Sequence, residues 1–211
     1  VLSDNKDLKT VATDSHRMSQ KVITLEKNGD NFDVVIPSRS LREFTSVFSD
    51  DIETVEVFFA NNQILFRSEH ISFYTRLLEG NYPDTDRLIP TEFNTEATFN
   101  VANLRFAMER ARLLSNTTQN GTVKLEFKNG VVSSHVHSPE VGRVNEEIDT
   151  SAVSGEDLSI SFNPTYLIEA LKAIDSEQVV IRFISSVRPF TLVPEGNEQG
   201  FIQLITPVRT N

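Results

Sequence analysis

The stretch "TVATDSHRMSQ", residues 10–20, places an acid, a hydroxyl, an imidazole and a guanidinium side by side as Asp14, Ser15, His16 and Arg17. Such groups serve in hydrolysis, in metal binding or in the polar rim of a binding pocket. Alternate residues of a strand face opposite sides, and neither set here is cleanly apolar, so the pattern predicts only a poor half-buried strand. The rest of the sequence has to decide among the three kinds of site.

Few features of the sequence indicate an enzyme or a metal site. A hydrolase using Asp14 and His16 would also need a nucleophile or metal ligands. Asp14 with His16, and His135 with His137, are spaced to point the same way on a strand, as metal-binding pairs do. The chain has no cysteine, and it shows no nucleophile elbow, phosphate-binding loop or glycine-rich dinucleotide loop. We therefore expect no catalytic centre, no metal and no cofactor.

The composition is that of an acidic protein without a membrane span. The chain has 211 residues, 38% of them hydrophobic, and a net charge of −10. An acidic chain repels phosphate backbones, which disfavours a conventional DNA-binding domain. It does not disfavour a protein that holds DNA without binding it tightly. No apolar run approaches the roughly 20 residues that cross a bilayer. We expect a cytoplasmic protein with no membrane partner, and a C-terminal piece of a longer chain.

A repeat organises the chain. Three segments run from a short strand into a helix, and the switch from strand to helix falls at Pro37, Asn100 and Asn163, each 63 positions after the previous one. Three strand-like runs follow each helix: 54–60, 63–68 and 71–78; then 122–127, 131–137 and 143–148; then 178–184, 188–194 and 201–208. A fixed period of this length indicates repeated supersecondary units. The unit is therefore strand, helix and three strands.

Each predicted helix has its own apolar stripe. In the third, Asn163 is the expected N-cap and Pro164 fits the first helical position. In the first, Ser40 and Glu43 have the spacing of a capping box, and the first strand is expected at 32–36. The stripes consist of Leu41, Phe44, Val47 and Phe48 in the first helix, Leu104, Ala107, Ala111 and Leu114 in the second, and Leu167, Ile168, Leu171 and Ile174 in the third.

Two turn-rich segments suggest a pocket at a domain junction. "EGNYPDTDRLIP", residues 79–90, brings Pro83 and Leu88 near Arg87, and the C-terminal "LITPVRTN" offers Leu204, Val208 and other apolar residues. Apolar residues with a few polar groups at a junction are typical of a ligand or peptide pocket. The alternative is a linker packed against its neighbours.

Four separated motifs carry a family resemblance. "TVATDSHRM", "GNYPDTDRLIP", "FNPTYLIEAL" and "ITPVR" resemble the bacterial DNA polymerase III β subunit, the sliding clamp family, in order and with similar spacing along the whole chain. The resemblance implies an α+β DNA clamp fold built of repeated strand-helix-three-strand units, with helices on the inner side and antiparallel sheets outside. It implies that residues 1–90 are the second half of a truncated middle domain and 91–211 the C-terminal domain.

The resemblance assigns the opening stretch to a peptide-binding pocket. Ser15 stands where many relatives have glycine, and Thr206 where some have methionine, so partner preference can differ. The full set implied for the pocket is Thr13, Ser15, His16, Arg17, Met18, Pro83, Arg87, Leu88, Asn163, Tyr166, Ser186, Leu204, Thr206, Pro207, Val208 and Arg209.

The resemblance also implies the partners. DNA polymerase subunits, the clamp loader and repair proteins would dock through short peptide motifs, and the full-length chain would close as a homodimer ring around double-stranded DNA. The hold on DNA would be topological and sequence-independent, without enzymatic activity. The helix residues expected to face DNA are Arg39, Arg42, Arg105, Arg112 and Lys172; an ordinary solvated helix face is the alternative.

Two other functions stay open from the sequence. One is the hydrolase that uses Asp14 and His16. The other is a repeat-built peptide-binding domain that is unrelated to DNA. Of the three, the resemblance favours the non-enzymatic clamp.

Overall fold

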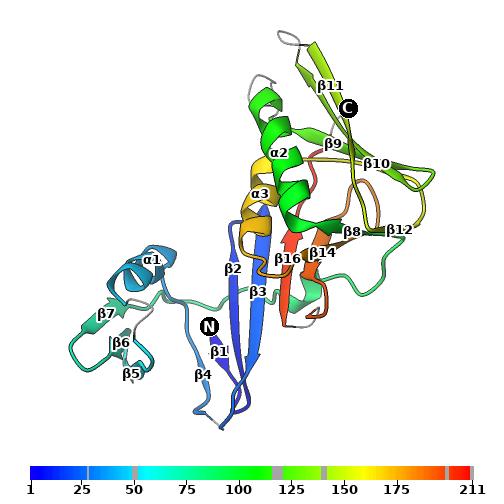
Figure 1. The fold of residues 1–211 in the computed structure, drawn as a ribbon. Coiled ribbons are helices and arrows are strands. Elements are labelled where there is room, and N and C mark those ends of the chain that lie inside the picture. Colours follow the sequence, from blue (N-terminus) through cyan, green and yellow to red (C-terminus); the bar gives the residue numbers. More distant parts are fainter. Residues whose placement is uncertain (28, 49–51, 116–120, 139–141, 198–199, 210–211) are drawn as a thin grey trace. The chain divides into compact units, whose positions relative to one another are not determined.

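The chain folds into two compact units. The computed structural model describes residues 1–27, 29–48, 52–115, 121–138, 142–197 and 200–209 (Figure 1). The first unit consists of Val1–Thr10 and Ile23–Asp84, and the second of Val11–Val22 and Thr85–Asn211. The hairpin of β2 (Asp7–Thr13) and β3 (Arg17–Thr24) therefore contributes residues to both units. No helix of the described part is long and apolar enough to cross a membrane.

The second unit holds two complete repeats. A short 3₁₀ turn, η1 (Asp86–Leu88), precedes them, and an additional strand, β12 (Ala152–Gly155), joins them. The first repeat is β8 (Thr95–Asn100), α2 (Val101–Ser115), β9 (Val123–Lys128), β10 (Val131–Ser138) and β11 (Gly142–Ile148). The second is β13 (Leu158–Phe162), α3 (Pro164–Lys172), β14 (Gln178–Phe183), β15 (Phe190–Pro194) and β16 (Phe201–Ile205).

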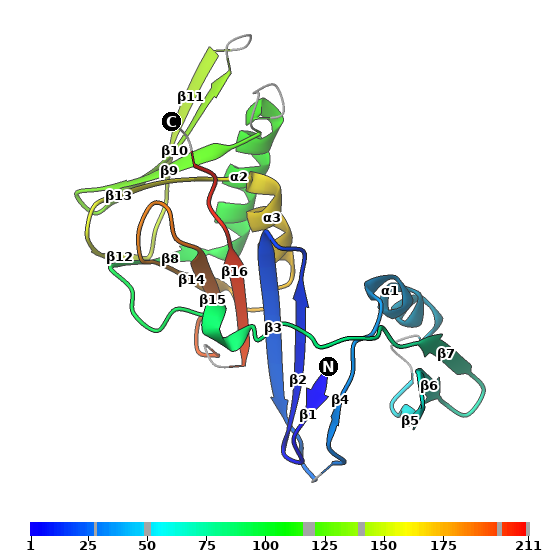
Figure 2. The same ribbon diagram turned by 180° about the vertical axis from the view of Figure 1, so that it is seen from behind.

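The two repeats exchange their leading strands. β13, which leads into α3, pairs antiparallel with β9 of the other repeat, and β8, which leads into α2, pairs with β14. The resulting strand orders within the unit are β11-β10-β9-β13 and β12-β8-β14-β15-β16-β3 (Figure 2). Each repeat thus completes a sheet of the other, so neither repeat is an independent folding unit.

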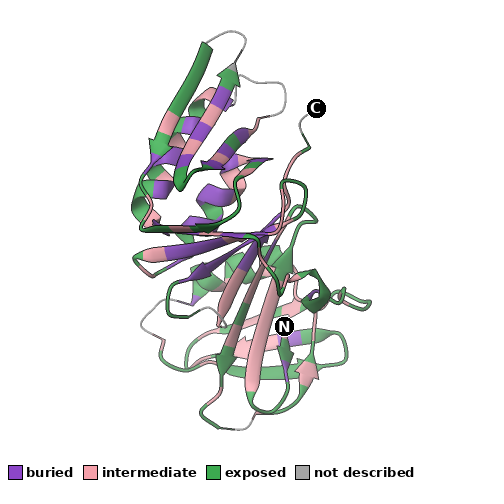
Figure 3. Ribbon diagram, turned by 90° about the vertical axis from the view of Figure 1, so that its right-hand side faces the viewer, coloured by how far each residue is buried: buried purple, intermediate pink, exposed green. Residues whose placement is uncertain are grey.

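The core of the second unit lies between its two helices and its sheets. α2 and α3 pack against each other, and Figure 3 shows buried residues concentrated in this unit. The predicted stripes are confirmed here, except that Leu114 is only partly buried and Ile174, although buried, lies beyond the end of α3. Five phenylalanines that are almost fully buried complete the core: Phe99, Phe127, Phe162, Phe183 and Phe190. Burial of one such side chain contributes about 1.5–3 kcal/mol.

Both helices of the second unit begin with an asparagine cap at the same position of the repeat. The Asn163 side chain accepts a hydrogen bond from the Thr165 N–H at 2.9 Å, and Pro164 occupies the first helical position, as predicted. Asn100, one period earlier, accepts from the Asn103 N–H at 3.1 Å. Both side chains satisfy donors that a helix start leaves unpaired.

The first unit holds one repeat and the strands of another. β1 (Leu2–Ser3) pairs with β2 and with β4 (Phe32–Asp33), which is shorter than the predicted 32–36 strand. The three strands after the helix form a separate antiparallel sheet in the order β5-β6-β7. The remaining elements are α1 (Ser38–Val47), β5 (Glu56–Ala60), β6 (Gln63–Arg67) and β7 (Ser72–Arg76). All nine strand runs predicted after the three helices thus form strands, with ends shifted by a few residues.

The predicted capping box of the first helix is wrong. α1 begins at Ser38 after Pro37, so Ser40 lies inside the helix rather than at its cap. The Ser40 hydroxyl instead lies 2.8 Å from the Thr75 hydroxyl, and Glu43 accepts from Arg39 Nε at 3.0 Å. Proline, which has no side-chain acceptor, leaves this helix start without a side-chain cap.

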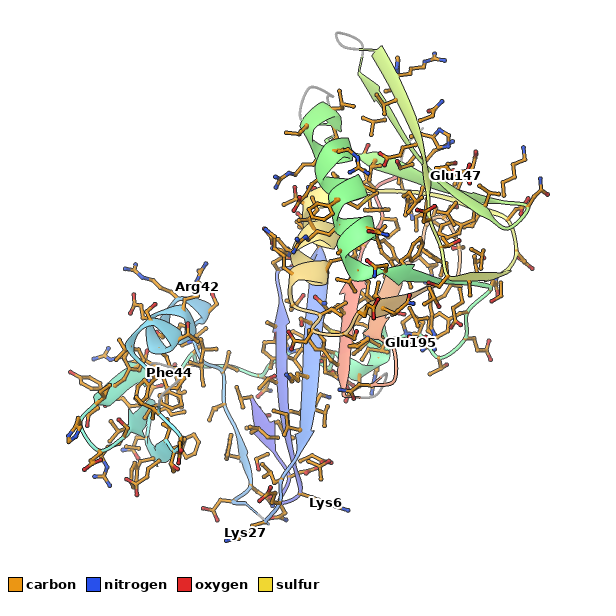
Figure 4. The ribbon with its side chains drawn as sticks, viewed as in Figure 1. Lys6, Lys27, Arg42, Phe44, Glu147 and Glu195 are labelled. Carbon is orange, nitrogen blue, oxygen red and sulfur yellow. The ribbon has the colours of Figure 1, made fainter. Side chains whose placement is uncertain are left out.

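The first unit has a thin core. Phe44 on α1 contacts Phe48, Phe66 and Phe73 with ring centroids 4.5–6.2 Å apart. Figure 4 shows Phe44 on the side of α1 that faces the sheet of β5, β6 and β7, and Arg42 on the opposite side. Two members of the predicted stripe, Leu41 and Val47, are nevertheless exposed.

Candidate functional site

The stretch that was expected as a poor strand is a hairpin tip. β2 ends at Thr13 and β3 begins at Arg17, and Ser15 between them has a φ of 73°, in the left-handed region that residues other than glycine rarely enter. The Asp14 Oδ1 atom accepts from the N–H groups of His16 and Arg17, both at 3.1 Å. The Thr13 hydroxyl donates to the Arg17 carbonyl at 2.7 Å. These hydrogen bonds pair backbone groups of the turn and fix its conformation. The side chains of His16 and Arg17 lie next to each other as a result.

Arg17 is held on three sides. Its Nε donates to Asp14 Oδ2 at 2.9 Å, its Nη1 donates to Glu169 on α3, and its guanidinium lies 4.7 Å from the Tyr166 ring centre. The His16 ring is nearly parallel to Tyr166, with centroids 6.1 Å apart. A guanidinium above an aromatic face gains cation–π attraction in addition to its ion pairs. The tip of the hairpin is thereby fixed to α3.

Asp14 and Arg17 each stabilise the charged form of the other. Partial burial by itself would raise the pKa of Asp14, but hydrogen bonds from Arg17 and from two backbone N–H groups, and the Arg17 charge, hold that pKa below its ordinary value. Partial burial likewise disfavours the Arg17 cation, yet its bonds to Glu169 and Asp14 raise its pKa above the ordinary value. Both groups are therefore charged at neutral pH.

The C-terminal tail joins the hairpin tip. Met18 and Leu204 are paired across β3 and β16 and are 3% and 5% exposed, so they form a buried floor. Beyond β16, the Thr206 N–H donates to the His16 carbonyl at 2.9 Å, and the Val208 N–H donates to the Ser161 carbonyl at 2.7 Å. The hairpin tip, the start of α3 and residues 204–208 thus form one surface, which we call the hairpin–tail site.

The structure brings together most residues of the predicted pocket. Thr13, Ser15, His16 and Arg209 are exposed, whereas Asn163, Tyr166, Thr206, Pro207 and Val208 are partly buried. Arg87 and Leu88 lie exposed on η1, Ser186 is exposed between β14 and β15, and Pro83 belongs to the first unit. No contact given above joins these four to the hairpin tip, and the role of every residue in the predicted pocket stays a prediction.

Sequence reasoning missed Glu169 as a member of the site. From the sequence, Glu169 was only one of the acids that balance the charge of basic residues on the helices. It lies 152 positions from its partner Arg17. One signal was present: Tyr166 and Glu169 are three positions apart, so they share a helix face. The residues around Tyr166 and Glu169 do not indicate that this face of the helix contacts Arg17 at the start of β3.

Similarity to known proteins covers the whole chain. Residues 1–84 match the sequence profile of the DNA polymerase III beta subunit, central domain, and residues 86–209 match that of its C-terminal domain. The chain belongs to the DNA polymerase III beta subunit family.

Named relatives agree with this membership. All 211 residues align at 79% identity with 56% of the "Beta sliding clamp" of Streptococcus pneumoniae serotype 4. A crystal structure of the DNA polymerase III beta chain of Streptococcus pneumoniae has a TM-score of 0.97, and it too is covered to 56%. The sliding clamp of Bacillus subtilis, at 36% identity, has a TM-score of 0.94 over all of this chain and 56% of its own. The chain thus spans about half the length of its beta subunit relatives.

The beta subunit profiles and the contacts divide the chain differently. The profiles meet between residues 84 and 86, close to the break at Asp84 and Thr85 between the two units. The contacts, however, assign Val11–Val22 to the second unit because β3 pairs with β16. The predicted ranges 1–90 and 91–211 remain a prediction about the domains of the longer chain.

Several basic residues lie on the helices. On α2 the Arg105 guanidinium is 3.7 Å from Glu109 and lies over the Phe106 ring, while on α1 Arg39 pairs with Glu43. Arg42 on α1, Arg112 on α2 and Lys172 on α3 make no ion pair with the described residues. Arg110 is different, because its bond with Glu146 on β11 fixes it to the sheet and raises its pKa.

The alternative metal and hydrolase sites receive no support from the geometry. The described residues contain no group of three or more histidine or acidic side chains that could hold a metal ion. Asp14 commits both carboxylate oxygens to backbone N–H groups and Arg17, so it does not orient the His16 ring as a catalytic acid would. His135 contacts Ser133 at 2.9 Å and Asn145 at 2.7 Å.

Proposed function

We propose that this chain is the larger part of a sliding clamp: a non-enzymatic processivity factor that encircles duplex DNA as a dimeric ring when full length. The observation that carries this proposal is the match of both halves of the chain to the beta subunit profiles, with 79% identity to a protein named "Beta sliding clamp". The fold is consistent with it, because the repeats place two helices side by side. The whole activity belongs to the longer chain.

The hairpin–tail site is the proposed dock for polymerases, the clamp loader and repair proteins. A short peptide with a glutamine and apolar anchors would lie across residues 206–208, above the floor of Met18 and Leu204. His16, Arg17 and Tyr166 would supply a polar and aromatic rim, the kind of residues that dominate binding energy at interfaces. A peptide of a few residues buries little surface, so dissociation constants on the order of micromolar are expected. Such affinities allow partners to exchange.

The helices are the proposed surface towards DNA. Arg105, Arg112 and Lys172 lie on the packed pair α2 and α3, and Arg39 and Arg42 on α1. Contacts from such residues to phosphates carry no sequence information and weaken with salt. A ring holds DNA topologically, so a chain with a net charge of −10 does not need high affinity. The same weakness permits sliding.

A labelled clamp-binding peptide tests the docking site by fluorescence anisotropy. Saturable binding to the 211-residue chain is expected, with roughly tenfold weaker binding by Arg17→Ala, because arginine anchors at interfaces are each worth about 1.4 kcal/mol or more. Leu88→Ala, which removes an exposed apolar side chain on η1, is expected to weaken binding by about threefold or more. Arg143→Ala, an exposed arginine on β11, is the matched control and should bind like the parent.

The full-length protein separates the remaining outcomes. Binding by full-length protein but not by a folded 211-residue chain would assign part of the site to residues outside this chain. Absence of binding by both would overturn the docking site. Retention of full-length protein on circular DNA, with release after the DNA is linearised, tests the ring itself. Peptide binding without such retention would favour the interaction domain that is unrelated to DNA.

A further inference from the structure

The first unit repeats the framework of the hairpin–tail site. Pro37 before α1 and Asn163 before α3 are two repeat periods apart, and in each case the residue two positions earlier accepts a backbone hydrogen bond from the segment after the last strand. The Val208 N–H donates to the Ser161 carbonyl at 2.7 Å, and the Leu78 N–H donates to the Val35 carbonyl at 2.8 Å. Leu78 thus occupies the position of Val208.

The strand register supports this correspondence. Ile64 of β6 is paired with Thr75 of β7, and Phe190 of β15 is paired with Ile205 of β16. Ile64 and Phe190 are two repeat periods apart and are both buried, so the two hairpins present the same faces inward. Residues 77–82 after β7 therefore correspond to the tail after β16.

A groove lies along this segment of the first unit. It has a volume of about 380 Å³, within the range of roughly 300–1,000 Å³ of ligand pockets, and all of its lining residues belong to the first unit. Leu77 and Leu78 supply apolar surface, and Leu78 is 54% exposed. Asn62 and Glu79 also line the groove, and the Asn62 side-chain amide donates a hydrogen bond of 3.4 Å to the Glu79 carboxylate.

The charge of the groove differs from that of the hairpin–tail site. Asp33 and Glu79 line the groove and are exposed, and no basic residue of the described part lines it. The hairpin–tail site is of mixed charge, because Arg17, Arg87 and Arg209 are predicted for it and Asp14 and Glu169 pair with Arg17 there. Glu79 directly follows the exposed Leu78, so it is the acid that meets a cationic ligand beside the apolar surface of the groove.

We propose that the groove of the first unit is a second peptide-binding site, which takes a short extended segment with an aliphatic or aromatic anchor beside a lysine or arginine. The anchor contacts Leu77 and Leu78, and the basic side chain reaches Glu79. This second site rests on the proposed function, because its counterpart is the proposed docking site for partner peptides. One scaffold would then sort two kinds of peptide by charge.

The test uses the 211-residue chain and the peptide Gly-Lys-Leu-Phe-Lys-amide, which carries fluorescein on its N-terminal amine. Anisotropy should give a dissociation constant on the order of 0.1 mM, because a small open groove buries little area. Glu79→Gln should weaken binding about two- to fivefold, as expected for one exposed ion pair, and Leu78→Ala by about threefold or more. Both side chains are exposed, so folding should be unchanged by circular dichroism. Glu69→Gln removes the same charge from another exposed position of the unit and should bind like the parent.

Nuclear magnetic resonance assigns the peptide to one of the two sites. Shifts of the backbone amides of residues 33–35, 61–62 and 77–82, together with losses in the Glu79 and Leu78 variants, are the expected result. Shifts at residues 13–17 and 206–208, with loss in Arg17→Ala, would overturn the groove as the site while leaving the hairpin–tail site intact. Absence of binding, or equal binding by a peptide with glutamates in place of both lysines, would also overturn it. Failure of the clamp-binding peptide at the hairpin–tail site would count against the proposed function separately.

Discussion

At the scale of single residues, the hairpin–tail site is organised around one guanidinium. Arg17 is bound by Asp14 from its own turn and by Glu169 from α3, and it lies over Tyr166. The turn acid is bound both to the backbone and to this arginine, so the hairpin conformation and the position of the arginine depend on each other. A partner peptide would thus meet a side chain that is already ordered, which lowers the entropy cost of binding.

Glu169→Gln should weaken binding of a clamp-binding peptide. The change removes the charge that holds Arg17 against α3, and exposed pairs of this kind are worth about 0.2–1 kcal/mol, so a loss of roughly 1.5- to fivefold is expected. Glu177→Gln, an exposed acid just before β14, is the control. Anisotropy titrations of the three proteins give the comparison. Equal affinities in all three would show that Glu169 does not position Arg17 for binding.

The Asp14 carboxyl should titrate below its ordinary value of 3.8. Because its pKa is lowered by folding, the stability that it contributes is complete above the pKa of the unfolded chain and is lost as the pH falls through the folded pKa. Asp14→Asn should therefore be less stable than the parent at pH 7, with a smaller difference at pH 2–3. Carbon-detected NMR titration and urea unfolding at the two pH values measure these effects. A folded pKa above 3.8 would contradict the assigned bonds.

At the scale of elements, α2 and α3 derive their positions from the stripes that they bury. Both helices have one face in the core of the second unit, whereas the opposite faces carry Arg112, Lys172 and other polar residues. α1 has an apolar stripe of the same kind, but Leu41 and Val47 on it are exposed. The same strand-to-helix pattern therefore leads to different degrees of burial, depending on what packs against the helix.

Leu104→Ala and Leu113→Ala should separate the two faces of α2. Leu104 is fully buried, so its truncation leaves a cavity and should lower the free energy of unfolding by about 2–5 kcal/mol. Leu113 is 69% exposed, and its truncation should change that free energy by no more than about 0.5 kcal/mol. Urea denaturation followed by circular dichroism measures both. Similar losses would mean that the assigned helix face is wrong.

At the scale of the whole molecule, the two units differ in how much core they contain. The hydrophobic cluster of buried residues belongs to the second unit, whereas Phe48 and Ile64 are the buried hydrophobic residues among the described part of the first. The first unit holds one full repeat, and in the second unit two full repeats complete each other's sheets. Stability should therefore be unequal along the chain.

Hydrogen exchange should reveal this inequality. Amides of β5, β6 and β7 should exchange well before those of β9, β13, β14 and β15, because opening the first unit exposes less apolar surface. Exchange measured by mass spectrometry on peptic fragments at neutral pH resolves the two groups. Uniform protection across both sets of strands would contradict the difference in core size and show that the chain opens as one cooperative body.

Local features of this chain follow from the sequence by itself. The 63-residue period, the start of α3 at Asn163 and Pro164, and the strand runs after each helix depend on residues close together in the chain, where propensity and periodicity act. The hairpin at Asp14 to His16 was missed, because its turn needs a positive φ at Ser15, which the residue type does not indicate. The capping box at Ser40 was wrong because a start three residues earlier changes the role of every residue in the first turn.

Tertiary structure alone decided how the repeats combine. β13 pairs with β9 and β8 with β14, so each repeat completes the other, and a period cannot tell this exchange from pairing within a repeat. The bond between Arg17 and Glu169, and the groove beside Leu78 and Glu79, likewise join residues that are distant in the chain. Family resemblance supplied the residues of the hairpin–tail site, but not the acid that holds its arginine. Such contacts depend on register and topology, which local sequence patterns do not specify.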